Sequence, residues 1–150
     1  MKTFQFFATT LIALFISACG TDDTDETPQD NYTTKELALH GGNSKYWVLT
    51  KELYNGTDIT ASYQECEIDN VYIYDKYDNY SIDAGPTKCT NNPEPDVSRG
   101  VYELDETANT LTITRPDSTL TANILALESS KLQIEFTVDG EVIQRTFEPK

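Results

Sequence analysis

The segment CEIDNVYIYDKYDNYSIDAGPTKC, residues 66–89, decides the fold that the sequence predicts. Two runs with alternating apolar residues, 71–75 and 79–83, flank the turn-forming residues 76–78, which is typical of a β-hairpin. Cys66 and Cys89 stand at the two ends of this segment. The chemical state of these two cysteines depends on the compartment that the chain reaches.

The first 18 residues carry the features of an export signal. Lys2 precedes an apolar run, residues 4–16, which is shorter than the roughly 20 residues that a membrane-spanning helix needs. Residues 16–19, Ile-Ser-Ala-Cys, resemble the bacterial lipobox. The resemblance implies that residues 1–18 are a lipoprotein signal peptide and that the thiol of Cys19 carries a lipid anchoring the protein to a membrane. The alternative is an ordinary signal peptide followed by an incidental cysteine.

With Cys19 assigned to lipidation, Cys66 and Cys89 have only each other as partners in an oxidising compartment. We therefore predict a structural disulfide between them. Closing a loop of this length stabilises a fold by about 3 kcal/mol in the chain-entropy model. A redox-active pair is the alternative, but neither cysteine lies in a C-x-x-C motif or beside an obvious base.

Residues 19–43 are predicted to be an acidic, flexible tether. The stretch 20–31 holds acidic and other polar residues and almost nothing apolar, so it has no surface to bury. This acidic run resembles the export tag of lipoproteins displayed on the outer face of the outer membrane, which implies a surface-exposed protein of the cell envelope. The run lacks the spacing of an EF-hand calcium loop. His40, beside Gly41-Gly42, is expected to be exposed to solvent.

Residues 44–150 are predicted to form one all-β domain, a small antiparallel meander of about eight strands that closes into a barrel or forms a sandwich. In the first strand, Trp47 and Leu49 share a face with Lys51 and Leu53, and Glu52 lies on the other. The residues 58–65 fit a short helix or a strand. Later strands alternate cleanly, and a one-residue slip in the apolar phase at 124–125 predicts a β-bulge.

The order and spacing of several loose motifs resemble the lipocalin-like domain of secreted bacterial lipoproteins, over residues 45–147. These motifs are Tyr46-Trp47-Val48-Leu49, Cys66-x-x-Asp69-Asn70, Tyr72, Tyr74, Cys89, Gly100-Val-Tyr-Glu-Leu, Leu111-Thr-Ile and a closing hairpin to Phe147. Lipocalins carry Gly-x-Trp on the first strand and a late Arg over that Trp, whereas here Lys45 replaces the Gly. The resemblance implies that Arg145 stacks on Trp47 by a cation–π contact.

Composition excludes several classes of function. The net charge of −14 disfavours binding to nucleic acid or to anionic lipid surfaces. A single histidine, no phosphate-binding glycine loop and no histidine-centred cluster leave nothing from which to build a catalytic site, so we expect neither an enzyme nor a cofactor or metal.

Two hypotheses for function remain. The first is a lipid-anchored carrier or sensor with a small apolar ligand inside the barrel, although the same alternation would also serve a plain packed core. The residues expected to face that interior are Trp47, Leu49, Ile73, Leu111, Ile134, Phe136 and Arg145. The second is an accessory module without a cavity that contacts a protein or glycan partner through rim loops and through exposed tyrosines, Tyr46, Tyr72 and Tyr74.

Overall fold

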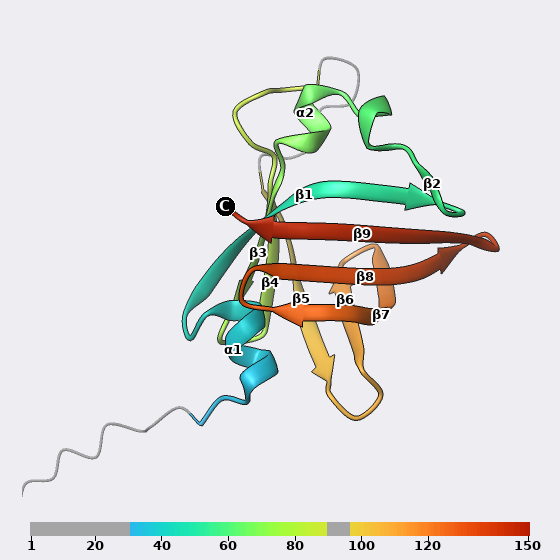
Figure 1. Ribbon diagram of the computed structural model, residues 1–150. Helices are drawn as coiled ribbons and strands as arrows, with labels where there is room; N and C mark the ends of the chain where they lie inside the picture. Colours follow the sequence, from blue (N-terminus) through green and yellow to red (C-terminus); the bar gives the residue numbers. More distant parts are fainter. Residues whose placement is uncertain (1–30, 90–96) are drawn as a thin grey trace, which may run out of the picture. The chain divides into compact units, whose positions relative to one another are not determined.

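The computed structural model describes residues 31–89 and 97–150, whose strands form a closed antiparallel β-barrel (Figure 1). Successive strands are hydrogen-bonded neighbours, and the last strand pairs with the first. The strands are β1 (Ser44–Tyr54), β2 (Thr57–Asp58), β3 (Val71–Asp75), β4 (Asn79–Asp83), β5 (Val97–Asp105), β6 (Thr110–Arg115), β7 (Ser118–Glu128), β8 (Lys131–Val138) and β9 (Glu141–Pro149). Because β2 is a two-residue strand that pairs only with the end of β1, the other eight strands close the barrel, and the predicted fold class is confirmed.

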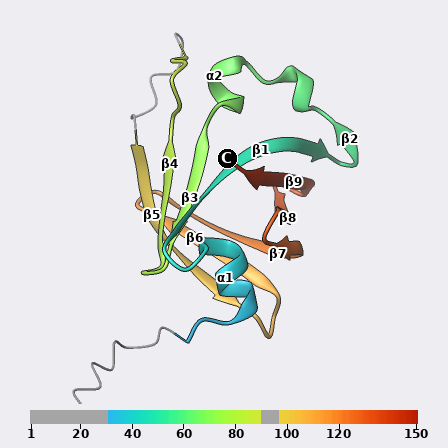
Figure 2. The same ribbon diagram turned by 60° about the vertical axis from the view of Figure 1, so that its left-hand side comes forward.

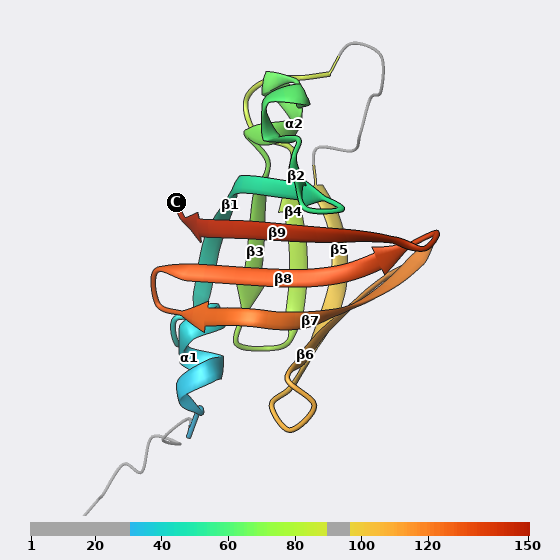
Figure 3. The same ribbon diagram turned by 45° about the vertical axis from the view of Figure 1, so that its right-hand side comes forward.

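Strand β1 closes the barrel by pairing with two different partners. Its first half, residues 44–48, pairs with β3, and residues 47–54 pair with β9 (Figure 3). The register against β9 shifts between Leu49 and Lys51, which makes Thr50 a β-bulge. A bulge moves the following residues to the opposite face of the sheet. Glu52, predicted to point outward, is therefore buried at 3% exposure, and this prediction is wrong.

Turn chemistry fixes two of the hairpins. Asn55-Gly56 and Asp139-Gly140 both have positive φ at each residue, as the tight turns of two-residue hairpins require. The bulge predicted at the apolar phase slip is confirmed, because the β7–β8 register shifts between Ile124 and Ala126.

A short helix, α1 (Thr34–His40), packs against one end of the barrel (Figure 2). It begins with a capping box, in which Thr33 and Glu36 satisfy each other's backbone N–H groups, and it ends at Gly41 in the left-handed region. Leu39 is fully buried, and its carbonyl accepts a 3.0 Å hydrogen bond from Trp47 Nε1. The helix thus covers the end of the barrel where Trp47 lies.

This helix corrects the predicted tether, since residues 34–43 are packed onto the barrel and residues 19–30 lie outside the described part of the chain. The expectation for His40 is wrong as well. Its side chain is 2% exposed, its Nδ1 accepts a hydrogen bond from the Gly42 N–H, and its ring meets that of Tyr32 edge-on at 4.6 Å. The helix buries it as a structural residue.

The packed core fills the half of the barrel next to α1. Three buried tyrosines sit together there, with Tyr74 contacting both Tyr80 and Tyr102 at 5.2 Å between ring centroids. The other buried members of this core are Leu39, Trp47, Leu49, Leu111, Ile113, Ala122, Ile124, Leu132, Ile134, Phe136 and Phe147. The short helices η1 (Thr60–Ser62) and α2 (Glu65–Ile68) lie at the opposite end of the barrel, where α2 is labelled in Figure 1. Two hollows leave the interior open at this end.

Candidate functional site: a polar cavity at the lid end of the barrel

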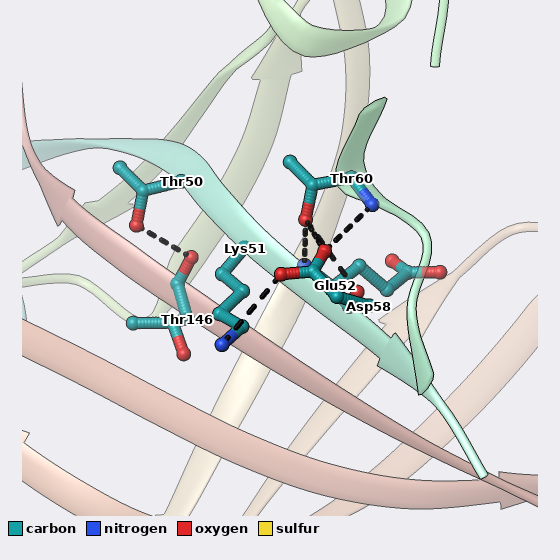
Figure 4. Close-up of polar contacts among 6 residues, drawn as sticks. All are labelled: Thr50, Lys51, Glu52, Asp58, Thr60 and Thr146. Carbon is teal, nitrogen blue, oxygen red and sulfur yellow. Dashed lines mark hydrogen bonds and ion pairs between the residues drawn. The ribbon is translucent and has the colours of Figure 1, made fainter. Parts of the chain in front are cut away.

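We call residues 59–70, which contain η1 and α2, the lid segment. One side of the lid segment is tied to β1 by Thr60, whose hydroxyl accepts a 2.9 Å hydrogen bond from the Glu52 N–H and donates to Asp58 Oδ1 at 2.7 Å (Figure 4). Asp58 Oδ1 also accepts from the Thr60 N–H at 3.0 Å. This polar cluster fixes the place where the chain leaves the β1–β2 hairpin and crosses the barrel.

A disulfide ties the other side of the lid segment. Cys66 in α2 is bonded to Cys89, with the Cα atoms 5.3 Å apart, so the predicted pairing is confirmed. The N–H of Thr87 donates to Asp69 Oδ2 at 2.9 Å and adds a second tie between the same two segments. The stretch that follows β4 is thereby held against the lid segment.

Below the lid segment, a buried carboxylate and a guanidinium meet inside the barrel. Glu52 and Arg145 are direct partners across the β1–β9 ladder, and Arg145 Nε lies 2.5 Å from Glu52 Oε2. The hydroxyl of Tyr63 donates to the other carboxylate oxygen, Glu52 Oε1, at 2.6 Å. Both oxygens of this buried carboxylate are therefore hydrogen-bonded, which offsets the cost of burying a polar group.

The pKa values of Tyr63 and Arg145 are both shifted within this cluster. Burial, together with the hydrogen bond and the negative charge of Glu52, raises the pKa of Tyr63 to about 12. Burial alone would lower the pKa of Arg145, but Tyr72 and Glu52 outweigh it and raise the pKa. Tyr63 therefore stays protonated and Arg145 stays charged across the physiological range.

A cavity of about 440 Å³ opens beside this cluster. This volume lies within the range of small-molecule sites in proteins, about 300–1,000 Å³. Its walls combine aromatic and aliphatic side chains with two guanidinium groups. The lining residues are Asn70, Tyr72, Tyr80, Ile82, Ser98, Ile113, Arg115, Asp117, Leu120 and Arg145.

A second hollow of about 180 Å³ lies directly under the lid segment. It shares Asn70, Tyr72 and Arg145 with the larger cavity and is lined also by both cysteines of the disulfide. The side-chain oxygen of Asn70 is buried and has no hydrogen-bond partner within the described ranges. An unsatisfied acceptor of this kind, in a wall shared by both hollows, suits a site that is completed by water or a ligand.

Comparison with protein families agrees with this architecture. Residues 44–134 match the model of the lipocalin-like domain. The chain belongs to the lipocalin-like domain family. Comparison with curated proteins finds no match. The matched residues include every strand that lines the cavity except β9, which supplies Arg145 and closes the barrel.

Most residues predicted to face the interior of this lipocalin-like barrel do so, but few of them line its cavity. The structure buries four of them in the packed core, namely Trp47, Leu111, Ile134 and Phe136. Leu49 also belongs to the core and reaches the hollow under the lid segment, whereas Arg145 lines both hollows. For the first four residues, the interpretation as plain core is the correct one.

Strand β3 has the opposite orientation from the one predicted. Tyr74 is 1% exposed in the core, and Tyr72 packs edge-on against the buried Phe147 at 5.0 Å. Ile73, which alternates with them, therefore lies on the outer face and does not line the interior. Of the three tyrosines predicted to be exposed, only Tyr46 is, at 50%.

The predicted stacking of Arg145 on Trp47 is wrong. Trp47 pairs with Pro149, whereas Arg145 pairs with Glu52, four residues away along β9, a distance of about 13 Å at 3.3 Å per residue. The cation over the Trp47 ring is Lys45, whose Nζ lies 4.3 Å from the centroid.

Lys45 Nζ also donates to the carbonyls of Ala38 and Ser129, each at 2.7 Å. It thereby joins α1 to the end of the barrel. Arg145 instead lies over the ring of Phe136, 5.3 Å from its centroid.

Sequence reasoning missed the cavity residues Arg115 and Tyr80. Arg115 continues the inward phase of Leu111 and Ile113 by two residues, and this alternation could have identified it. Tyr80 faces inward opposite Tyr74 on the neighbouring strand, a placement that depends on the orientation of β3.

Other predictions concern the N-terminal segment, membrane-spanning helices and metal ligands. Cys19 and the signal peptide lie outside the described residues, so their roles stay predictions. In residues 31–89 and 97–150, no helix is long and apolar enough to cross a membrane. The same ranges contain no cluster of three potential metal-ligating side chains of His, Cys, Asp or Glu.

Proposed function

We propose that this lipocalin-like protein binds a small molecule in the cavity at the lid end of its barrel and acts as a carrier or sensor without catalysis. The observation that supports this proposal is the uneven filling of the barrel. Large side chains pack the half next to α1, while the other half contains an open cavity of about 440 Å³ lined by both apolar and polar groups. Such mixed walls are typical of sites that hold and orient a ligand.

A binding role also suits the chemistry of the cavity walls. Glu52 accepts hydrogen bonds from both Tyr63 and Arg145, so the carboxylate is engaged in a structural cluster. His40, the one histidine of the sequence, lies in α1 at the other end of the barrel. The proposal therefore assigns recognition to the cavity and no acid–base step.

We propose further that the protein is held at the surface of the cell envelope by a lipid on Cys19. The lipobox-like residues 16–19 and the acidic run after them support this address. Metabolic labelling of the full chain in a bacterial host with an alkyne-bearing fatty acid tests it. Label should appear in the wild type and be absent from Cys19→Ala, and equal labelling of both would contradict the assignment.

Ligand binding is tested first on the protein as purified. Native mass spectrometry and solvent extraction should reveal a bound small molecule, and an environment-sensitive fluorophore such as 1-anilinonaphthalene-8-sulfonate should bind and be displaced by the extract. In Ser98→Phe, a ring projecting from β5 would occupy the cavity, so probe binding should fall at least tenfold.

The matched control is Ser81→Phe, since Ser81 lies on the opposite face of β4 from the inward Tyr80 and Ile82. It makes the same substitution without filling the cavity. Equal loss of binding in both variants would mean that the probe does not report on the cavity, and the proposal would fail.

The alternative role as a surface module has less support. It was based on a row of exposed tyrosines, but Tyr72 and Tyr74 face the interior, and only Tyr46 remains outside. A protein or glycan partner would have to be recognised by other features of the surface.

A further inference from the structure

Arg115, the last residue of β6, presents to the cavity a cation that forms no ion pair within the described ranges. Its Nε donates to the Ser118 hydroxyl at 3.2 Å, and no Asp or Glu oxygen in the described ranges lies within 4.0 Å of its guanidinium. Arg145, the other cation of the cavity, differs because Glu52 pairs with it at 2.5 Å. Arg115 is therefore the cavity cation that has no direct carboxylate partner within the described ranges.

The fold holds Arg115 in place through Gly100. Both residues belong to the inward phase of neighbouring strands, and a Cβ atom on Gly100 would lie 3.1 Å from Cγ of Arg115 and 2.3 Å from the Thr114 carbonyl oxygen. Only glycine leaves room for this approach. The stem of Arg115 thus packs over β5, which limits the positions of its guanidinium.

Apart from Glu52, which is paired with Arg145, two carboxylates lie near the cavity or the hollow beside it. Asp117 also lines the cavity, but it is exposed in the β6–β7 turn, where solvent screens its charge, and it accepts a hydrogen bond from Ser118. Glu67 lines only the hollow under the lid segment, and its Oε2 accepts from the Gln64 N–H. The place where a ligand anion meets the least repulsion is therefore beside Arg115.

The wall around Arg115 is suited to an apolar body. Two aromatic rings and three aliphatic side chains line the same cavity, namely Tyr72, Tyr80, Ile82, Ile113 and Leu120. At about 30 Å³ per water-sized group, the cavity of about 440 Å³ holds a molecule of roughly 15 non-hydrogen atoms or fewer. The cavity volume therefore limits the ligand to a short molecule.

We propose that the ligand is a small amphipathic carboxylate whose anionic group pairs with Arg115 and whose apolar body lies against the tyrosines and aliphatic residues of the wall. This inference rests on the proposed function and adds the chemical class of the ligand. A planar guanidinium pairs with a carboxylate through two parallel hydrogen bonds, which gives orientation as well as affinity.

A matched pair of probes tests the inference on the purified protein by isothermal titration calorimetry. 4-Phenylbutyrate fits the size limit and carries the anion, and 4-phenylbutan-1-ol has the same body without it. We expect the wild type to bind the carboxylate at least tenfold more tightly than the alcohol. In Arg115→Gln, the affinity for 4-phenylbutyrate should fall about 10- to 100-fold, while that for the alcohol stays the same.

Arg99→Gln is the control, because Arg99 is exposed on the outer face of β5 and its loss changes the net charge by the same amount. It should leave both affinities unchanged. Equal weakening by Arg99→Gln would mean that the whole molecule's charge, and not Arg115, attracts the anion, which would overturn the inference.

Two other outcomes separate this inference from the proposed function. If the wild type binds both probes equally well, the cavity takes ligands but does not select anions, so only the inference fails. If neither probe binds and no molecule is extracted from the purified protein, the proposed function fails, and the inference fails with it.

Discussion

The interior pair of Glu52 and Arg145 yields the sharpest prediction about stability. The side chain of Glu52 is 4% exposed and that of Arg145 is 28% exposed, so the two are not equally able to turn to water when left alone. Arg145→Met leaves a buried carboxylate with one donor, Tyr63, and should cost about 3–4 kcal/mol of unfolding free energy. Glu52→Leu leaves a guanidinium that can reach the solvent of the cavity, and should cost about 2 kcal/mol.

The double variant distinguishes a coupled pair from two independent residues. Because it leaves no unpaired charge, its loss should be smaller than the sum of the single losses by about 2 kcal/mol or more. Urea denaturation of the four proteins, followed by circular dichroism, measures these free energies. For a domain of this size, the loss in Arg145→Met corresponds to a fall in Tm of about 10–15 °C.

The exposed pair of Lys51 and Asp58 supplies the control cycle. Its nitrogen and oxygen lie 3.6 Å apart, and both side chains are about half exposed. Its coupling energy should be much smaller than that of the buried pair, since solvent screens the two exposed charges. Additive losses at Glu52 and Arg145, or a coupling no larger than that of the exposed pair, would refute the argument that burial makes this ion pair matter.

Three further predictions follow from the packing, the disulfide and the tyrosines. Replacing Cys66 and Cys89 by Ala should lower the unfolding free energy by about 3.4 kcal/mol, from closure of a 24-residue loop, and a melting curve equal to that of the wild type would show that the bridge contributes nothing. Leu39→Ala should cost about 2–5 kcal/mol in urea denaturation because the side chain is fully buried, whereas Leu37→Ala, at 47% exposure, should cost under about 1 kcal/mol; similar losses would mean that α1 is not docked as described. Stability should fall as pH rises above 10, because unfolded tyrosines ionise near pH 10, whereas in the folded protein burial raises the pKa of Tyr63 to about 12 and also raises the pKa values of the core tyrosines Tyr74, Tyr80 and Tyr102. Thermal melts at pH 9, 10 and 11 should show a falling Tm, and a constant Tm would contradict the raised pKa values.

Local chemistry explains why several sequence predictions are confirmed. The dipeptides Asn55-Gly56 and Asp139-Gly140 favour the positive φ angles of tight hairpins wherever they stand between two strands. The bulge near Leu125 could be predicted because the apolar phase of β7 itself slips by one residue. The capping box of Thr33 and Glu36 was also present in the sequence, three residues apart, and would have predicted α1.

Other features were decided by partners far away in the chain. The β1 sequence keeps one apolar phase from Trp47 to Leu53, so its alternation does not predict the bulge at Thr50. The bulge arises where β1 aligns with β9, and it turns Glu52 inward to meet Arg145. A charged residue on an apparently outer face thus becomes part of the interior.

The sequence by itself determined the β meander, its turns and the pairing of Cys66 with Cys89, because strand alternation, turn residues and the number of available thiols are local or compositional properties. Only the tertiary structure decided which face of β3 is inside, since Val71 and Ile73 alternate with Tyr72 and Tyr74, and both sets can be buried. The rings of Tyr80, Tyr102 and Phe147 complete the packing around the tyrosines. The packed core near α1 and the open space beside Arg115 therefore depend on how the strands close into a barrel. No single stretch of sequence specifies this closure.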